Sequence, residues 1–173
     1  MGTENEKFLS LEELREVLDY NPETGKFTWK KRISDKCPVG VSAGSIRNGR
    51  ITITIYKRRY HASRLAFAMC YGRWADGQID HINRDPLDNR IINLREATHS
   101  QNLANTKRRT DNTTGYKGVT YIARIKRFQA QLWAKNQKYN LGYYLSAEEA
   151  YEVYLAKAKE LFGEFHYAGE LNG

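Results

Sequence analysis

The stretch "IDHINRDPLDNRIINLREATHSQN", residues 79–102, combines short apolar segments with an unusual density of asparagine and aspartate. The first segment, "GQIDHI", ends in the pair Asp80-His81, and "RIINLREAT" supplies a second segment with strand character. "THSQNLANT" then opens a helix, with Thr98 and Gln101 at capping-box positions. The pattern predicts two strands followed by a helix, an arrangement that brings strand-end and helix-start side chains together.

These side chains suit phosphodiester chemistry. Asp80 and Asn102 can offer two oxygen ligands to a hard cation such as Mg²⁺. Because successive side chains of a strand diverge, His81 would lie beside the metal on the neighbouring face. A neutral imidazole at that position can take a proton from water. His99, on the same predicted helix, remains a rival ligand to Asn102.

The polar residues between the two strands also have a simpler explanation. Asparagine and aspartate form turns, and we interpret Asn83, Asp85, Asp88 and Asn89 as residues that shape the connecting loop. The acids among them could hold a second metal, but turn geometry is the favoured interpretation. Spacing alone does not decide the chemistry.

Composition restricts the class of protein. The 173 residues carry a formal net charge of +8 and 12% aromatic residues, which favours nucleic acid over a membrane as partner. No apolar run approaches the roughly 18 residues that a spanning helix needs, so we expect a cytoplasmic protein. Cys37 and Cys70 cannot provide a four-ligand zinc site. We expect reduced thiols, one in a loop and one buried, and no structural zinc.

The first part of the chain predicts a helix in "LSLEELREVLDYNPETG", where Ser10 and Glu13 have capping-box spacing. Its apolar stripe consists of Leu11, Leu14 and Leu18. The segments "KFTWKK" and "RITITIY" predict strands, separated by residues 31–49, which lack clear periodicity. "ASRLAFAMCYG" predicts a second helix, which ends at Gly72.

The last part of the chain predicts a separate module. The polar stretch "TKRRTDNTTG", residues 106–115, has the composition of a linker. After it, "YKGVTYIARIKRFQAQLWAKNQKYNLGYY" shows strand alternation, and "SAEEAYEVYLAKAKELFG" predicts a helix between Ser146 and Gly163. The predicted sheet is basic, because residues 107–138 contain nine Lys or Arg and a single acid, Asp111.

Alternation in the strand "FQAQLWAK" separates an apolar face from a polar one. The apolar set, expected to lie against the helix, is Phe128, Ala130, Leu132 and Ala134. The opposite set is Gln129, Gln131, Trp133 and Lys135. An exposed tryptophan between glutamines indicates contact with sugars, bases and phosphates. A solvated sheet face with one exposed tryptophan is the alternative.

Residues 79–102 resemble the motif of HNH nucleases, in the form without zinc-binding cysteines that occurs in phage and intron-encoded homing endonucleases. The shared features are the Asp-His pair, an asparagine twelve residues after His81 within "NLR", and another asparagine nine residues later. The likeness extends upstream through "YHASRLAFAMCYG" and covers residues 50–106.

This resemblance implies a role for each matching residue. By position, His81 is the general base, and Asp80 and Asn102 hold one Mg²⁺ or Mn²⁺ ion. Asn93 fixes the loop and orients His81. Arg95 either steadies the scissile phosphate or makes a surface salt bridge.

The C-terminal module resembles an AP2/ERF DNA-binding domain in "YKGV", in "LGYYLSAEEAYEVY" and in the glycine after the helix. That family lays a three-stranded sheet in the major groove of DNA. Several family arginines are missing and the first hairpin differs in length, so no base preference is implied. By position, the implied DNA-binding residues are Lys117, Arg124, Lys126, Arg127, Gln129, Gln131, Trp133, Lys135, Lys138 and Asn140.

We therefore expect an α+β chain with a ββα-metal nuclease core, followed by a small three-stranded antiparallel sheet packed on one helix. The expected parts are an N-terminal helix-and-hairpin extension (1–49), the nuclease core (50–106), a linker (107–115) and an AP2-like domain (116–173). The resemblance implies a homing endonuclease that acts on double-stranded DNA. One active site per chain predicts nicking of one strand, and we expect a monomer on DNA. The alternatives are a catalytically inactive DNA-binding regulator and an RNA-binding module, which is less favoured because the sheet lacks paired exposed aromatics.

Overall fold

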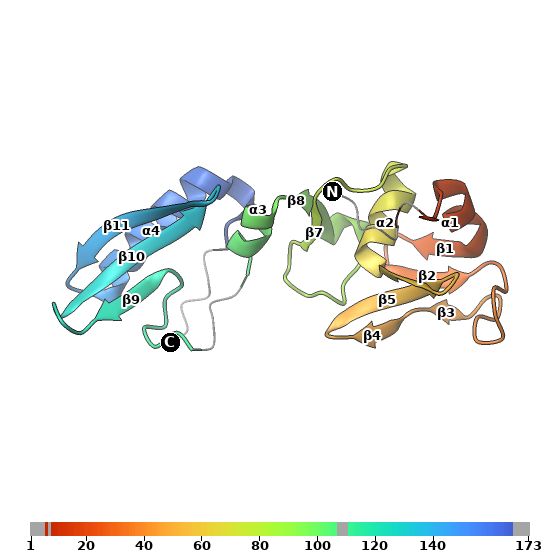
Figure 1. Ribbon diagram of the computed structural model, residues 1–173, viewed down its shortest axis with the longest axis horizontal. Helices are drawn as coiled ribbons and strands as arrows, with labels where there is room; N and C mark the ends of the chain where they lie inside the picture. Colours follow the sequence, from red (N-terminus) through yellow and green to blue (C-terminus); the bar gives the residue numbers. More distant parts are fainter. Residues whose placement is uncertain (1–5, 7, 107–110, 168–173) are drawn as a thin grey trace. The chain divides into compact units, whose positions relative to one another are not determined.

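The protein forms two compact units, Met1–Thr98 and His99–Gly173 (Figure 1). Each unit has its own hydrophobic core. The computed structural model describes residues 6, 8–106 and 111–167. Both units combine helices with small antiparallel sheets, which confirms the expected α+β class. Among the described residues, no helix is long and apolar enough to cross a membrane.

The described residues of the first unit form three small sheets and two α-helices. The N-terminal elements are α1 (Leu11–Val17), β1 (Leu18–Asn21), β2 (Lys26–Trp29) and β3 (Ser42–Ala43). The elements that follow are β4 (Ser45–Arg47), β5 (Arg50–Ile55), β6 (Arg58–His61) and α2 (Ala62–Tyr71). The unit ends with β7 (Gln78–His81), the 3₁₀ turn η2 (Ile91–Asn93) and β8 (Leu94–Ala97). The sheet orders are β1-β2-β3, β4-β5-β6 and β7-β8.

The first helix is shorter than the sequence predicts. Its capping box is present, with the Ser10 hydroxyl accepting from the Glu13 amide and the Glu13 carboxylate accepting from the Ser10 amide. The helix stops at Val17, however, and Leu18 begins a strand instead of extending the apolar stripe. Leu18 pairs with Trp29 and is fully buried, so the contacts of the hairpin outweigh local helix propensity.

The N-terminal residues that we expected as an extension share one core with the predicted nuclease segment. Residues from α1, β1 and β2 pack in the same buried cluster as residues from β5, α2, β7 and β8. A buried ion pair adds to this, because the Arg64 guanidinium of α2 contacts the Glu6 carboxylate. The N-terminal segment is therefore a structural part of the unit that contains Asp80 and His81.

Helix α2 also fixes the entry to β7. Arg64 donates to the carbonyl oxygens of Ala75 and Gly77, 2.6 Å away in each case, and so holds the segment that leads into β7. The helix ends at Gly72 in the left-handed conformation, as predicted. Cys70 is exposed, so the expectation of one buried thiol is wrong: the last turn of α2 presents this residue to solvent.

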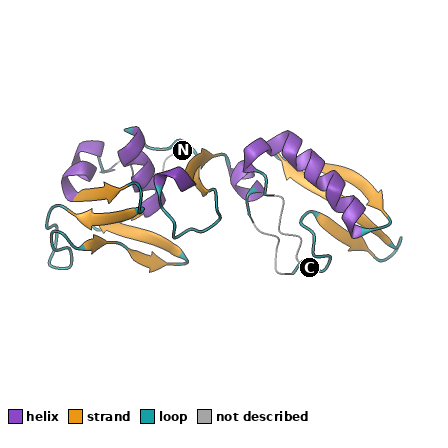
Figure 2. Ribbon diagram, turned by 180° about the vertical axis from the view of Figure 1, so that it is seen from behind, coloured by secondary structure: helices purple, strands orange, loops and turns teal. Residues whose placement is uncertain are grey.

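The second unit is a three-stranded sheet covered by one long helix (Figure 2). Its elements are α3 (His99–Ala104), β9 (Val119–Ile122), β10 (Arg127–Ala134), β11 (Gln137–Tyr144), α4 (Ala147–Phe162) and the 3₁₀ turn η3 (Gly163–Phe165). The apolar face of β10 is buried as predicted, with Ala130, Leu132 and Ala134 in the core beneath α4. The Ser146 hydroxyl caps α4 by accepting from the Glu149 amide at 3.1 Å.

Of the predicted linker, residues 107–110 lie outside the described residues. Residues 111–115 are tied to the sheet. The Asn112 amide group donates to the carbonyl of Tyr116 at 2.9 Å, and the Thr114 hydroxyl donates to that of Val119 at 3.0 Å. This end of the stretch belongs to the folded second unit.

Gly118 provides a test of packing in the second unit. It has a φ of +76°, and a Cβ there would lie 2.2 Å from the Tyr154 ring, whereas Gly115, with φ +81°, has nothing within 4 Å. We expect Gly118→Ala to destabilise the unit by at least about 3 kcal/mol, because the clash adds to the backbone strain. Gly115→Ala, the matched control, should cost about 1 kcal/mol.

The measurement is hydrogen exchange of α4 amides in both variants. Equal protection in Gly118→Ala and Gly115→Ala would show that the Tyr154 contact is absent in solution.

Candidate active site

The hairpin of β7 and β8 carries three of the predicted site residues. Asp80 pairs with Arg95 and His81 pairs with Leu94 in the antiparallel register. Across the hairpin, Arg95 Nε donates to Asp80 Oδ2 at 2.9 Å. The two side chains are 13% and 4% exposed, so this is a shielded ion pair and not the surface salt bridge that we considered for Arg95.

Asn93 closes the loop between the two strands. Its Oδ1 accepts from the amide of Asn83 at 2.9 Å, and its Nδ2 donates to Asn83 Oδ1 at 3.0 Å and to the Asp88 carbonyl at 2.8 Å. Its own carbonyl accepts from the amide of Ile82 at 2.9 Å. Asn93 is buried, so these bonds hold both ends of the loop against the hairpin without competition from water.

The remaining loop residues make the turn contacts that we expected of them. Asn83 Oδ1 accepts from the Asp85 amide and Asp85 Oδ1 from the Leu87 amide, which are two consecutive Asx turns. Both Asp88 oxygens accept from the Arg90 guanidinium, and this pairing lowers the Asp88 pKa to about 2. The carboxylates are thus engaged in loop geometry.

His81 is almost fully buried at the end of β7. Its Nε2 lies 3.2 Å from Oδ1 of Asn89, itself only 2% exposed. Desolvation lowers the pKa of His81, the nearby Arg50 charge lowers it further, and the Asn89 hydrogen bond and Asp80 oppose the shift. The imidazole is therefore kept neutral near pH 7, as a proton acceptor must be.

Asp80 has the donor chemistry of a ligand for a hard cation. Mg²⁺ is held in proteins by one or two carboxylates, completed by water and substrate phosphates. One buried carboxylate at a strand end fits that pattern, and a bound cation would share it with Arg95. Within residues 6, 8–106 and 111–167, no group of three or more His, Cys, Asp or Glu side chains could hold a metal. Any cation here would therefore depend on oxygen ligands of other kinds.

The other two candidate ligands, Asn102 and its rival His99, lie on α3. This helix belongs to the second compact unit, whereas Asp80 and His81 belong to the first. The roles of Asn102 and His99 as ligands remain predictions.

Asn89 is the functional candidate that sequence reasoning missed. We assigned it to turn geometry, and its Nδ2 does donate to the Leu87 carbonyl at 3.2 Å. Its contact with His81 spans eight residues and is created by the way the loop folds back onto β7. No spacing rule indicates such a contact.

The polar face of the second unit gathers most of the predicted DNA-binding residues. Cross-strand pairs join Gln131 with Asn140 and Trp133 with Lys138. Arg124 and Lys126 lie in the β9–β10 turn, and Arg127 begins β10; all three are exposed. Lys135 lies in the β10–β11 turn with a φ of +51°, because β10 ends at Ala134, one residue earlier than expected.

The same face is more aromatic than we expected. Trp133 is 65% exposed and Tyr143 is 50% exposed, and Gln129, the pairing partner of Tyr143, donates to its hydroxyl at 3.3 Å. The two aromatic residues are not cross-strand partners, because Trp133 pairs with Lys138 and Tyr143 with Gln129. The expectation that the sheet lacks paired exposed aromatics therefore stays a prediction. The bulge between Ala130 and Gln131 changes the register of β11, and Tyr143 pairs with Gln129 beyond it.

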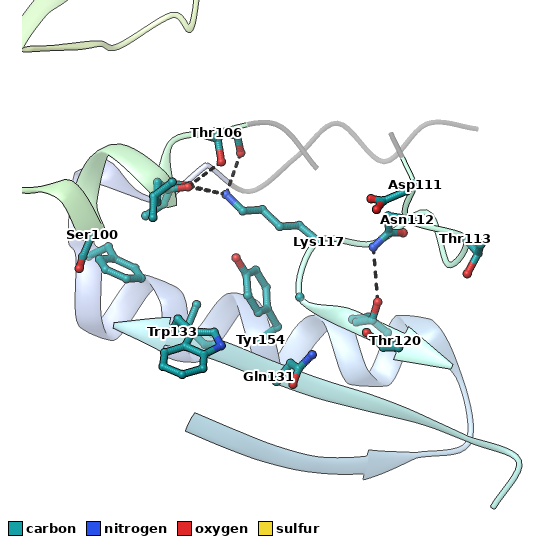
Figure 3. A pocket seen from close by; sticks show the side chains of 16 residues that line it. Ser100, Thr106, Asp111, Asn112, Thr113, Lys117, Thr120, Gln131, Trp133 and Tyr154 are labelled. Atoms are coloured by element: carbon teal, nitrogen blue, oxygen red, sulfur yellow. Dashed lines mark hydrogen bonds between the residues drawn. The ribbon is translucent and has the colours of Figure 1, made fainter. Parts of the chain in front are cut away.

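Lys117 makes structural contacts and does not extend from the polar face. Its Nζ donates to the carbonyl oxygens of Leu103, Ala104 and Thr106 at 3.1, 2.7 and 2.7 Å (Figure 3). These bonds satisfy carbonyls at the end of α3, where a cation also complements the helix dipole. A DNA contact by Lys117 would require breaking them, so we remove it from the DNA-binding set.

Gln131 also differs from its neighbours on β10. It lines a pocket of about 660 Å³ beside Trp133 and Tyr154 (Figure 3), and its Oε1 is buried without a hydrogen-bond partner among the described residues. Because this oxygen is buried, the case for Gln131 as a DNA contact is weaker.

Comparison with known proteins adds to this geometry. Residues 60–104, which include α2, the β7–β8 hairpin and α3, match the HNH endonuclease family HNH_3. Over 87 residues the chain is 30% identical to Protein 3.8 of Escherichia phage T7, which covers 50% of this chain and 71% of that protein. The chain belongs to the family of Protein 3.8. No solved structure matches it significantly.

The matched HNH segment thus includes every residue to which the resemblance to HNH nucleases assigned a catalytic or metal-binding role. Asp80, His81, Asn93 and Arg95 fall within residues 60–104, and so does Asn102. The matched segment excludes residues 1–59, although these contribute to the core that supports the hairpin.

We expect Asn93→Asp to loosen the loop of the HNH domain. A carboxylate would place an oxygen where Nδ2 now donates, facing the Asn83 Oδ1 and Asp88 carbonyl oxygens. Losing two buried donors should lower the free energy of unfolding by about 2 kcal/mol or more. Urea unfolding, together with hydrogen exchange of the Asn83 amide, measures this.

Asn48→Asp, at an exposed turn of the same unit, is the matched control and should leave both quantities nearly unchanged. A stability of Asn93→Asp equal to that of the control would contradict the assigned role of Asn93.

Proposed function

We propose that this protein is a metal-dependent endonuclease that hydrolyses phosphodiester bonds in double-stranded DNA, with His81 as general base. The observation that carries the proposal is that His81 is buried directly beside Asp80 and that burial lowers its pKa, which favours the neutral imidazole. Asn93 holds the loop of the same hairpin in place through its hydrogen bonds. The match of residues 60–104 to HNH endonucleases supports the same chemistry.

In the proposed reaction, a water oxygen attacks phosphorus while the water proton passes to the His81 imidazole. The bond between phosphorus and the 3′-oxygen breaks, and that oxygen leaves and takes up a proton from solvent. Asp80 and Asn102 would hold one Mg²⁺ or Mn²⁺ ion, which supplies charge stabilisation for the phosphate and the leaving oxygen. Arg95, bonded to Asp80, adds a positive charge next to the carboxylate.

We further propose that the second unit is an AP2-like reader of duplex DNA and that the enzyme is of the homing type. An antiparallel sheet covered on one face by α4, with basic and aromatic side chains on the other, supports the reader function. A nuclease site has little base readout of its own, and a tethered reader would raise its local concentration at chosen sites. One active site per chain implies nicking of one strand by a monomer.

One observation favours a second candidate, a DNA-binding regulator without catalytic activity. The Asp80 carboxylate already has a compensating partner in Arg95, so its charge does not require a metal ion. Such a protein would bind DNA through the second unit and leave the backbone intact.

Relaxation of supercoiled plasmid tests the two candidates. With Mg²⁺ or Mn²⁺ we expect nicking that a chelator abolishes, and a fall in rate of about 10²- to 10⁴-fold in His81→Ala. The nicking rate of Asp80→Asn should fall by a comparable factor, because the cation loses its charged ligand. Asp35→Asn, a 95% exposed carboxylate in the same unit, is the matched control and should cut like the parent.

Binding of a selected DNA site without any cutting, by a folded protein and with either metal, would favour the regulator. Cutting that persists in the presence of the chelator would contradict the role of the metal.

The polar face of the sheet predicts a salt-dependent affinity for DNA. Lys138→Gln should reduce the slope of log K against log salt by about 0.9, because one phosphate contact is lost. Lys159 is exposed on α4, on the other side of the sheet. Lys159→Gln removes the same charge there and should leave the slope unchanged.

Fluorescence anisotropy with duplex DNA and with single-stranded RNA at equal salt measures these slopes. Tighter binding of the RNA would favour stacking on Trp133 and Tyr143 over reading of a duplex.

A further inference from the structure

Asn89 is joined to the proposed general base by a hydrogen bond whose direction can be worked out. The Nδ2 and Oδ1 atoms of its side-chain amide each contact one partner. Nδ2 lies 3.2 Å from the Leu87 carbonyl oxygen, and Oδ1 lies 3.2 Å from His81 Nε2. A carbonyl oxygen can only accept, so the amide must present its NH₂ group to Leu87. Its oxygen consequently faces His81.

The orientation of the amide decides the state of the imidazole. An amide oxygen only accepts hydrogen bonds, so the His81 Nε2 atom must carry the proton. The opposite tautomer would set the Nε2 lone pair against the Asn89 oxygen. Rotating the amide by 180° would relieve that repulsion but would create another against the Leu87 carbonyl. Both atoms are buried, so water cannot substitute for either contact.

We propose that Asn89 is a positioning residue that holds His81 in the Nε2–H tautomer and thereby makes Nδ1 the atom that accepts the proton from water. A proton added at Nδ1 leaves the Nε2–H···Oδ1 bond intact. The contact therefore serves both the neutral ring and the cation that forms when it acts as a base. The tautomer is independent of the proposed nuclease function, whereas the role of Nδ1 as proton acceptor rests on it.

The N-terminal hairpin of β1 and β2 contacts the backbone of Asn89. The Tyr20 hydroxyl donates to the Asn89 carbonyl at 2.7 Å, and the amide of Ile91 donates to the Pro22 carbonyl at 3.3 Å. Gly25 lies so close that a Cβ would stand 2.6 Å from the Asn89 carbonyl carbon. The turn between β1 and β2 thus fixes the backbone from which the Asn89 side chain reaches His81, and this assigns a function to residues outside the matched HNH segment.

Nuclear magnetic resonance reports the tautomer directly. In ¹⁵N-labelled full-length protein, with chelator and at a pH where imidazoles are neutral, two-bond ¹H–¹⁵N correlations distinguish a protonated ring nitrogen from an unprotonated one. His81→Gln assigns the His81 signals among the four histidines. We expect a protonated Nε2 and an unprotonated Nδ1. A protonated Nδ1, or averaged shifts in the parent protein, overturns the proposal.

Variants at Asn89 and Tyr20 separate the effect of the Asn89 side chain on the His81 tautomer from the effect of contacts to the Asn89 backbone. Asn89→Leu removes the acceptor, keeps the branched shape of the side chain and should yield mixed tautomers, whereas Asn89→Asp keeps an acceptor and should retain Nε2–H. Tyr20→Phe is the matched control, because it removes a contact to the Asn89 backbone and leaves the side chain in place. A parent-like tautomer in Asn89→Leu overturns the proposal.

Cleavage kinetics test the consequence. Asn89→Leu should lower kcat by about 10- to 100-fold with unchanged KM, because the change affects proton transfer and not DNA binding. An unchanged kcat overturns the role of Nδ1. A parent protein that shows the Nε2–H tautomer but cuts no DNA supports the assignment of the tautomer and overturns the nuclease function.

Discussion

The hydrogen bonds of Asn93 are the constraint on which the rest of the candidate site depends. A loop of ten residues rich in Asn, Asp and Arg lies between Ile82 and Asn93, and its backbone groups need partners once the hairpin is buried. One asparagine supplies an acceptor and two donors to that loop, in addition to its backbone bond. Since the loop is closed in this way, Asn89 comes to lie against His81, and His81 is held at the end of β7. An aliphatic residue at position 93 would leave these groups unpaired.

Support for the site comes from parts of the chain that carry no chemistry themselves. Arg64 of α2 holds the entrance to β7, and the β1–β2 turn packs against the backbone of Asn89. Such contacts give the N-terminal residues a structural role in the unit that contains Asp80 and His81. A proton acceptor must be held within a fraction of an ångström, and buried neighbours achieve that better than a solvated loop.

In the proposed function, chemistry and recognition are divided between the units. The first unit buries its reactive side chains in a tight network, and the second presents basic, amide and aromatic side chains on an open sheet. Catalysis needs fixed geometry and a dry surrounding, whereas phosphate binding works at exposed positions through charge. Lys117 shows that charge alone does not identify a DNA contact, because its ammonium group is occupied by the carbonyls of its own chain.

The sequence by itself determined the α+β class, the strands at residues 50–55 and 78–81, and the helices that end at Gly72 and near Gly163, because local periodicity and capping chemistry encode these features. The loop role of Asn93 was implied by the resemblance to HNH nucleases and not by any local pattern. The sequence also pointed to Asp80 and His81. Only the tertiary structure decided that Leu18 joins a strand, that Arg95 pairs with Asp80, and that Lys117 caps α3. The contact of Asn89 with His81 was likewise decided by the fold. In each of these cases the partner is brought in by strand pairing, by loop closure or by packing against a distant segment, and no local pattern records which groups burial will leave side by side.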